Sequence, residues 1–292
     1  MKLSKEDVEL VYKLHWGLLY YANERYVVIR NSNSPDFHGK NIEDMGKLED
    51  KLFSHPELID SFIKENPLNF SEIELDIIKG WKNFVKEEFF IFSNSNQTIF
   101  LSGKNPKAYE VIGLHDEIQD VIPFEPYYSN AVLLPFKNKI IYSGILQGFN
   151  INMGGGMKNV IMGDFIKAKN KFGVISSLDQ PLIEKEESYE ELLKFYLKNE
   201  KNRFEHEMDI DKLLKKDPNL IIVYNQELGK SNARKIRKRL SELNVNSGWF
   251  AVLNDVIIAS GKNEQEVKQR LTETISEDKL NRVFIFNYKN AK

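Results

Sequence analysis

Apolar residues in the first part of the chain, residues 1–87, recur at helical spacing. Leu58, Ile59 and Phe62 share one face of a helix predicted over 56–65. Ser4 and Ser71 are each followed three residues later by an acid, a pattern typical of a helix start. Residues 1–87 are therefore predicted to form a helical N-terminal region whose short helices pack on each other or on the next domain.

Residues 88–178 change to short apolar runs bounded by polar turns. FFIFSNSNQTIFLSG reads as two strands around a turn, and KAYEVIGL, SNAVLLPF and KIIYSG add further strands. Such consecutive short strands predict a small antiparallel β domain, a barrel or curled sheet, followed by a helix over 157–173. Gly154–Gly156 precede that helix and act either as a hinge or as a loop that a ligand can approach closely.

The remaining chain divides into a charged helical connector, residues 179–218, and a C-terminal domain, residues 219–292. The predicted elements of the domain are a strand at 220–226, a helix at 231–243, strands at 248–254 and 255–261, a helix at 263–276 and a strand at 282–288. The order βαββαβ is that of ferredoxin-like domains. The predicted fold class is therefore α+β.

Composition narrows the function only by exclusion. The 292 residues include no cysteine, which removes disulfides, thiolate zinc sites and a cysteine nucleophile. The sequence shows neither a signal-peptide core nor an apolar run long enough to cross a membrane, so we expect a cytoplasmic protein without a membrane partner. No cofactor motif is readable, and we expect no cofactor. Because 41 basic residues balance 43 acidic ones, only local patches can indicate nucleic acid.

The clearest local patch lies on the predicted helix after residue 230. Its cations are Lys230, Arg234, Lys235, Arg237, Lys238 and Arg239. Ala233, Ile236 and Leu240 form an apolar stripe, which directs the cations to the other side. One-sided positive charge is typical of contacts with phosphate backbones, and a solvated face balanced by acids elsewhere is the alternative.

Gly229, Lys230 and Ser231 are predicted to lie between a strand and a helix, where an anion could bind the helix N-terminus. A phosphate-binding loop also requires a glycine five positions before Gly229, and Tyr224 stands there. The alternative is that Ser231 simply caps the helix after a glycine turn.

His115, Asp116 and Glu117 are weak candidates for a metal site, because imidazole and carboxylate groups bind divalent ions. Three hypotheses follow. The leading one is a binding or regulatory protein, not an enzyme, that contacts nucleic acid through residues 230–239. The others are a metal-assisted hydrolase that uses His115, Asp116 and Glu117, and a structural protein that self-associates as a homo-oligomer through exposed sheet edges.

Two segments resemble uncharacterised prokaryotic protein families of unknown function. The first is the LLPF…IIYSG stretch, Leu133 to Leu146. The second is the hairpin GWFAVLNDVIIASG at 248–261, in which Trp249, Ala251, Ala259 and Gly261 carry the resemblance. Neither resemblance implies an activity, a cofactor or a set of site residues.

Overall fold

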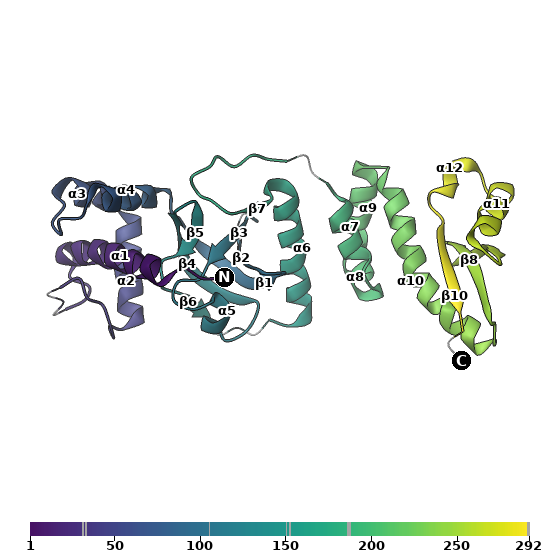
Figure 1. Ribbon diagram of the computed structural model, residues 1–292, viewed down its shortest axis with the longest axis horizontal. Helices are drawn as coiled ribbons and strands as arrows, with labels where there is room; N and C mark the ends of the chain where they lie inside the picture. The colour runs from purple at the N-terminus through teal and green to yellow at the C-terminus, as the bar shows by residue number, and fades with distance from the viewer. Residues whose placement is uncertain are drawn as a thin grey trace. The chain divides into compact units, whose positions relative to one another are not determined.

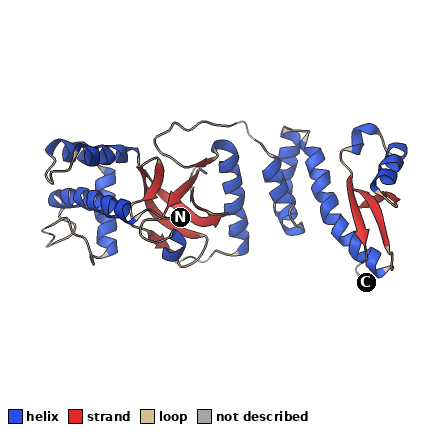
Figure 2. Cartoon of the chain, viewed as in Figure 1, coloured by secondary structure: helices blue, strands red, loops and turns tan. Residues whose placement is uncertain are grey.

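A computed structural model describes residues 1–30, 32, 34–104, 106–149, 151, 153–185 and 188–290. The chain divides into two compact units, Met1–Glu186 (unit 1) and Glu187–Lys292 (unit 2). Each unit combines helices with a mainly or wholly antiparallel sheet, and the α+β class is confirmed (Figures 1 and 2). The finer boundaries at residues 87, 178 and 218 stay predictions. Within the described part of the chain, no helix is long and apolar enough to cross a membrane.

Unit 1 begins with a group of helices, as its spacing predicts. They are α1 (Lys5–Tyr26), α2 (Ile42–Ser54), α3 (Glu57–Glu65), α4 (Glu72–Gly80) and the short 3₁₀ turn η1 (Trp81–Asn83). Ser71 and Glu74 form a complete capping box at the start of α4, which confirms the predicted signal. The sequence interpretation missed α2. The Asn41 side chain caps α2 by accepting a hydrogen bond from the Glu43 backbone N–H at 2.7 Å.

The predicted strands close into a barrel. They are β1 (Val85–Asn94), β2 (Gln97–Ser102), β3 (Ala108–Ile112), β4 (Tyr127–Phe136) and β5 (Lys139–Tyr142). Pairing runs β1-β2-β3-β5-β4 and returns to β1. β1 pairs with β4 through its first half and with β2 through its second half. The one departure of the barrel from antiparallel pairing is β3 with β5, which are parallel.

Alternating side chains of the strands fill the barrel. Phe89 of β1 contacts Phe100 and Tyr109, with ring centroids 5.6 and 6.1 Å apart. These rings belong to one hydrophobic core that also contains Leu14 and Leu18 of α1. The helical region and the barrel therefore share a core, because the helices bury part of the barrel's outer surface.

Further elements surround the barrel. They are α5 (Ile118–Val121), β6 (Gln147–Phe149), which pairs with β4, α6 (Gly155–Phe172), and β7 (Val174–Ile175), which pairs with β3. α6 packs on the outside of β3, and its Phe165 contacts Phe92 of β1 with ring centroids 5.5 Å apart. Gly154 caps α6 with an extended backbone, and a Cβ at Gly154, Gly155 or Gly156 would meet nothing within 4 Å. These glycines therefore form an open strand-to-helix corner.

Unit 2 begins with four helices. They are α7 (Glu190–Leu197), α8 (Glu200–Glu205) and α9 (Glu207–Lys216), which lie within the residues predicted as a charged connector, and the long α10 (Leu220–Glu242). The sheet and its remaining helices follow as β8 (Ser247–Leu253), β9 (Val256–Gly261), α11 (Glu264–Thr274), α12 (Glu277–Leu280) and β10 (Phe284–Lys289). The sheet order is β10-β8-β9, and both pairings are antiparallel. The strands predicted at 248–254 and 255–261 pair as an antiparallel hairpin, and Asn254 in its turn has a φ of 57°.

The strand predicted at 220–226 is wrong, because these residues form the first half of α10. Ile221, Ile222 and Val223 favour a strand locally, but Asn225, Gly229 and Ala233 follow at helical spacing as one buried stripe. The helix packs on α7 and on the sheet. A single glycine costs a helix only about 1 kcal/mol, so Gly229 does not end it. From α10 onward the described order is therefore αββααβ, which lacks the first strand of the ferredoxin-like pattern.

The sheet of unit 2 lies between two helices. Ala233, Ile236 and Leu240 of α10 pack with Val252 and Phe286 on one face of the sheet. Val267 and Leu271 of α11 pack with Ala251 and Ala259 on the other face. Both faces are covered because the alternating side chains of β8 are apolar on either side.

Gly229 provides a test of the position of α10. A Cβ at Gly229 would lie 2.3 Å from the Cβ of Phe284, so the helix can approach β10 this closely only without a side chain there. In an exposed helix, Gly→Ala stabilises by about 1 kcal/mol. We expect Gly229→Ala instead to destabilise unit 2 by about 1–3 kcal/mol through overpacking, measured by urea denaturation. A stabilised variant would contradict this packing, and Lys238→Ala at an exposed position of the same helix is the control.

Candidate functional site

The predicted basic patch lies on the second half of α10, where packing fixes its direction. Ala233, Ile236 and Leu240 face the sheet and are buried. At about 100° per residue, Arg234 and Lys238 lie roughly 40° apart on the opposite side of the helix. Both side chains are exposed. The predicted separation of an apolar stripe from a basic face is therefore present.

The structure divides the six cations into two groups. Lys230 pairs with Glu227 at 2.6 Å, and Lys235 pairs with Glu200 of α8. Arg237 donates to the Asn287 backbone oxygen at 3.0 Å, and its guanidinium lies 4.9 Å from the centre of the Phe286 ring. These three side chains hold α10 to its neighbours or to itself.

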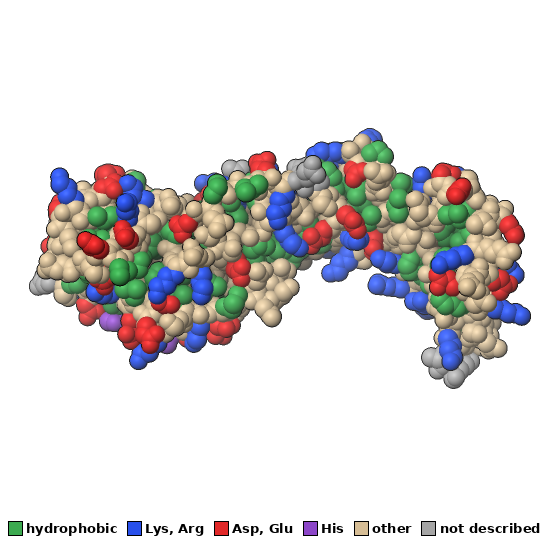
Figure 3. All heavy atoms as spheres, turned by 45° about the horizontal axis from the view of Figure 1, so that its top comes forward, with side chains coloured by type: hydrophobic (Ala, Val, Ile, Leu, Met, Phe, Trp, Pro, Cys, Tyr) green, Lys and Arg blue, Asp and Glu red, His purple; other side chains and the backbone are tan. Residues whose placement is uncertain are grey.

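Arg234, Lys238 and Arg239 form the second group, which we call the free basic face. All three are exposed, and they have no acidic partner within the described residues. Figure 3 shows basic and acidic side chains interspersed over each unit on the face that it draws. A group of cations without acidic partners on one helix therefore differs from the rest of that surface. The sequence pattern identified these residues but could not separate them from the paired ones.

Gly229, Lys230 and Ser231 do not form a turn at a helix N-terminus, because they lie in the interior of α10. Gly229 is buried against Phe284, and Lys230 pairs within the helix. Ser231 accepts a hydrogen bond from Arg203 at 3.5 Å. The structural premise of the predicted anion site is therefore wrong, and the three residues serve packing and pairing within unit 2.

His115, Asp116 and Glu117 follow β3 and are exposed. His115 Nδ1 lies 3.4 Å from Asp116 Oδ1, while Glu117 pairs with the Met1 amine at 3.2 Å. Over the residues that the structure describes, no three His, Asp or Glu side chains come together in a metal-binding group. The three predicted candidates are thus neighbours in sequence without forming a shared set of ligands.

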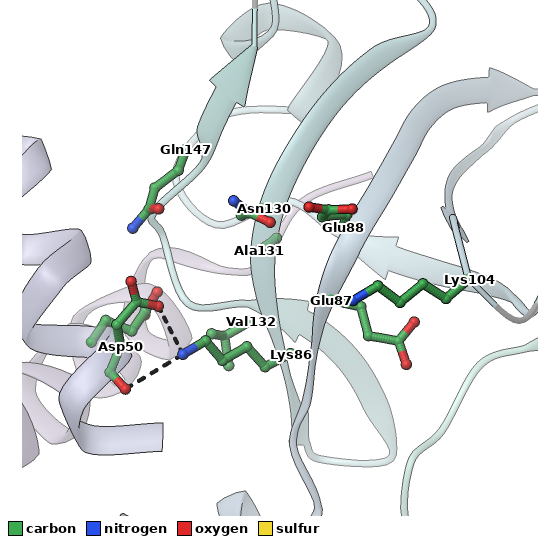
Figure 4. Close-up of a pocket in the computed structure, with 10 residues that line it drawn as sticks. Asp50, Lys86, Glu87, Glu88, Lys104, Asn130, Ala131, Val132 and Gln147 are labelled. Carbon is green, nitrogen blue, oxygen red and sulfur yellow. Dashed lines mark hydrogen bonds and ion pairs between the residues drawn. The ribbon is translucent and has the colours of Figure 1, made fainter. Parts of the chain in front are cut away.

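A polar cavity of about 210 Å³ lies between α2 and the outer face of β1 and β4 (Figure 4). The Lys86 ammonium pairs with Asp50 Oδ1 at 2.7 Å and so ties β1 to α2. The amides of Asn130 and Gln147 point toward the same space. The volume is below the usual range for small-molecule sites, about 300–1,000 Å³. We interpret the cavity as an ion-pair site at the seam between the helices and the barrel.

The sequence interpretation missed a buried pair of titratable groups. His15 of α1 and Glu49 of α2 are 1% and 3% exposed, and His15 Nε2 lies 3.3 Å from Glu49 Oε1. The ring of Trp81 meets the imidazole edge-on, with centroids 6.1 Å apart. The sequence contained a signal for this pair, because each residue is a polar side chain on the apolar face of its helix. A polar group buried there needs a partner.

A second missed feature is an aromatic cavity of about 640 Å³ beside α1. Its lining includes Tyr12, Trp16, His38 and His115. Burial, together with the Asp116 carboxylate, raises the pKa of Tyr12, so its hydroxyl keeps its proton at neutral pH. Spacing alone could not reveal this cavity, because its lining comes from α1, the following loop and the segment after β3.

Comparisons with known proteins give no relative for this chain: no family model, curated protein or solved structure matches it.

The His15–Glu49 pair yields a stability prediction. Removal of one partner leaves the other polar group buried alone, and we expect His15→Leu or Glu49→Leu each to destabilise unit 1 by about 1–3 kcal/mol. The double variant should regain most of that loss, because no unpaired group remains. Chemical denaturation of the two single variants and the double variant forms a double-mutant cycle. Strictly additive losses would mean that the two side chains do not interact.

Proposed function

We propose that the protein is a non-enzymatic binding or regulatory protein that contacts nucleic acid through the free basic face of α10. The observation that carries the proposal is the set of exposed cations Arg234, Lys238 and Arg239, which have no acidic partner among the described residues. Because phosphate oxygens carry the charge of every nucleic acid, such a face favours the backbone over particular bases.

The arrangement of α10 supports this proposal in two further ways. Its buried stripe and the Arg237 contacts to β10 hold the helix against the sheet, so the free cations are presented from a rigid element. Lys235 lies between Lys238 and Arg239 around the helix. Its ion pair with Glu200 is exposed and so weak enough to exchange partners when a phosphate approaches.

The proposal predicts salt-sensitive binding. With about three phosphates neutralised, affinity for duplex DNA or single-stranded RNA should fall roughly 20-fold to 40-fold between about 50 and about 200 mM salt. The combined variant Arg234→Ala, Lys238→Ala and Arg239→Ala should abolish that dependence. Fluorescence anisotropy with short labelled DNA and RNA measures both effects.

A matched control removes the same charge elsewhere in unit 2. Lys201, Lys212 and Lys268 pair with acids on α8, α9 and α11. Their combined replacement by alanine should leave affinity within about two-fold of the parent if the free basic face makes the contact. Equal losses in the two variants would show only a general charge effect, and would count against the proposal.

A second candidate function is self-association through β9, an edge strand of the sheet in unit 2. Val256 and Ile257 at its start are 57% and 41% exposed, and exposed apolar edges pair readily with other strands. Arg270 bonds the Ser260 backbone oxygen at 2.7 Å and shields the far end of the strand.

Self-association through β9 predicts a concentration-dependent mass in light scattering. Val256→Lys should shift the protein to the monomer, because a charge on the edge opposes pairing. A mass that equals the monomer over a wide concentration range would remove this candidate.

A further inference from the structure

The aromatic cavity beside α1 has the size and lining of a small-molecule site. Its volume of about 640 Å³ falls within the range of about 300–1,000 Å³ for such sites. Leu3 and Val8 supply its apolar wall, and Tyr12, Trp16, His38 and His115 contribute rings. The backbone of Leu3 donates to the Gly113 oxygen at 3.0 Å, which fixes that wall against the end of β3. The whole lining belongs to unit 1.

The rings are held in fixed mutual positions. The centroids of Tyr12 and Trp16 lie 5.1 Å apart, and His38 meets Trp16 edge-on at 4.5 Å. Phe37, which is buried, supports the other side of this group with its centroid 6.5 Å from that of Trp16. A partly exposed indole braced in this way offers a flat apolar surface, on which planar rings stack favourably.

A smaller cavity of about 240 Å³ shares Tyr12, Trp16 and His38 and extends toward Ser143 and Gly144. Gly144 has a φ of 96°, a backbone conformation that favours glycine, and it lies beside the Tyr12 ring at the end of β5. The Tyr12 hydroxyl, which stays protonated, is a hydrogen-bond donor at this position.

Charge around the larger cavity favours an anion. Lys2, Lys5 and Lys13 line it together with one acid, Glu9. Lys13 is engaged by Glu74, and the Lys5–Glu9 pair is long, 3.9 Å, and exposed. Lys2 has no ion pair among the residues that the structure describes. Lys2 and Lys5 are therefore the cations that a ligand could reach.

We propose that this cavity binds a planar aromatic ligand that carries a negative charge, with the ring stacked on Trp16 and the anionic group near Lys2 and Lys5. A nucleoside monophosphate has this chemistry, and so does an aromatic sulfonate or carboxylate. The site is in unit 1 and uses none of the α10 residues, so it is independent of the function proposed for unit 2.

Tryptophan fluorescence of the full chain tests the proposal directly. The three tryptophans are Trp16 in the cavity, the buried Trp81 and Trp249 in unit 2. The probes are AMP, adenosine, inorganic phosphate and anilinonaphthalene sulfonate, with excitation at the red edge of the tryptophan band. We expect AMP to quench the emission and to bind at least about 10-fold more tightly than adenosine or phosphate, since only AMP combines ring and charge.

Two sets of variants locate the binding. Trp16→Phe should lose the quenching while calorimetry still detects AMP, and Trp249→Phe should keep both. Trp16→Ala should lower the affinity for AMP by about 10-fold to 100-fold, which is the usual effect of a lost stacking partner. The double variant Lys2→Ala, Lys5→Ala should lower the affinity for AMP and leave the affinity for adenosine unchanged. These lysines are exposed, so the double variant tests the charge without disturbing the fold.

Three outcomes would overturn the inference. One is an absence of AMP and sulfonate binding up to millimolar concentration in a folded protein. Another is sulfonate binding that Trp16→Ala leaves intact, which would indicate a non-specific apolar crevice. The third is equal affinity for AMP and adenosine in the parent and in the lysine variant, which would remove the anionic requirement.

Discussion

The double pairing of β1 is the constraint on which unit 1 depends. Because β1 pairs with β4 over Val85–Ile91 and with β2 over Phe89–Asn94, the strands close into a barrel, and Phe89–Ile91 are paired on both sides. Closure places Phe89, Phe100 and Tyr109 inside and leaves apolar residues such as Phe92 on the outside. That outer apolar surface requires covers, and α6 and the N-terminal helices supply them.

The helices that cover the barrel also form two cavities beside it. Where α2 meets the outer face of β1 and β4, polar side chains remain at the seam, and Lys86 with Asp50 closes it. Where α1 passes the end of β3, its Tyr12 and Trp16 are covered only in part, which leaves the aromatic cavity. His15 lies one residue before Trp16, on the buried side of the same helix, and pairs with Glu49 of α2. One helix therefore both holds the helical layer together and lines the cavity.

Local patterns predicted much of the fold, and the errors have a common cause. Strand alternation located β1 to β5 closely, and Ser71 with Glu74 marked the start of α4, because both signals depend on neighbours in sequence. The sequence of residues 220–226 predicts a strand because its β-branched side chains favour one in isolation. Long-range packing on α7 and β10 decides otherwise. The barrel closure, the parallel pairing of β3 with β5 and the aromatic cavity are likewise long-range, and short windows of sequence cannot contain them.

The basic helix shows how packing converts a composition signal into a surface. Gly229 and Ala233 bring α10 close to β10, and this contact sets the rotation of the helix about its axis. With the rotation fixed, Arg237 reaches Phe286 and Asn287, while Arg234 and Lys238 are directed to solvent. Six cations that look equivalent in the sequence thus differ in what they can do. The cations in ion pairs and backbone contacts stabilise unit 2. Only the cations of the free basic face, which have no such contacts, are available to a partner. A single substitution at Gly229 would alter that division without changing any charged residue, because it would turn or displace the helix that carries them.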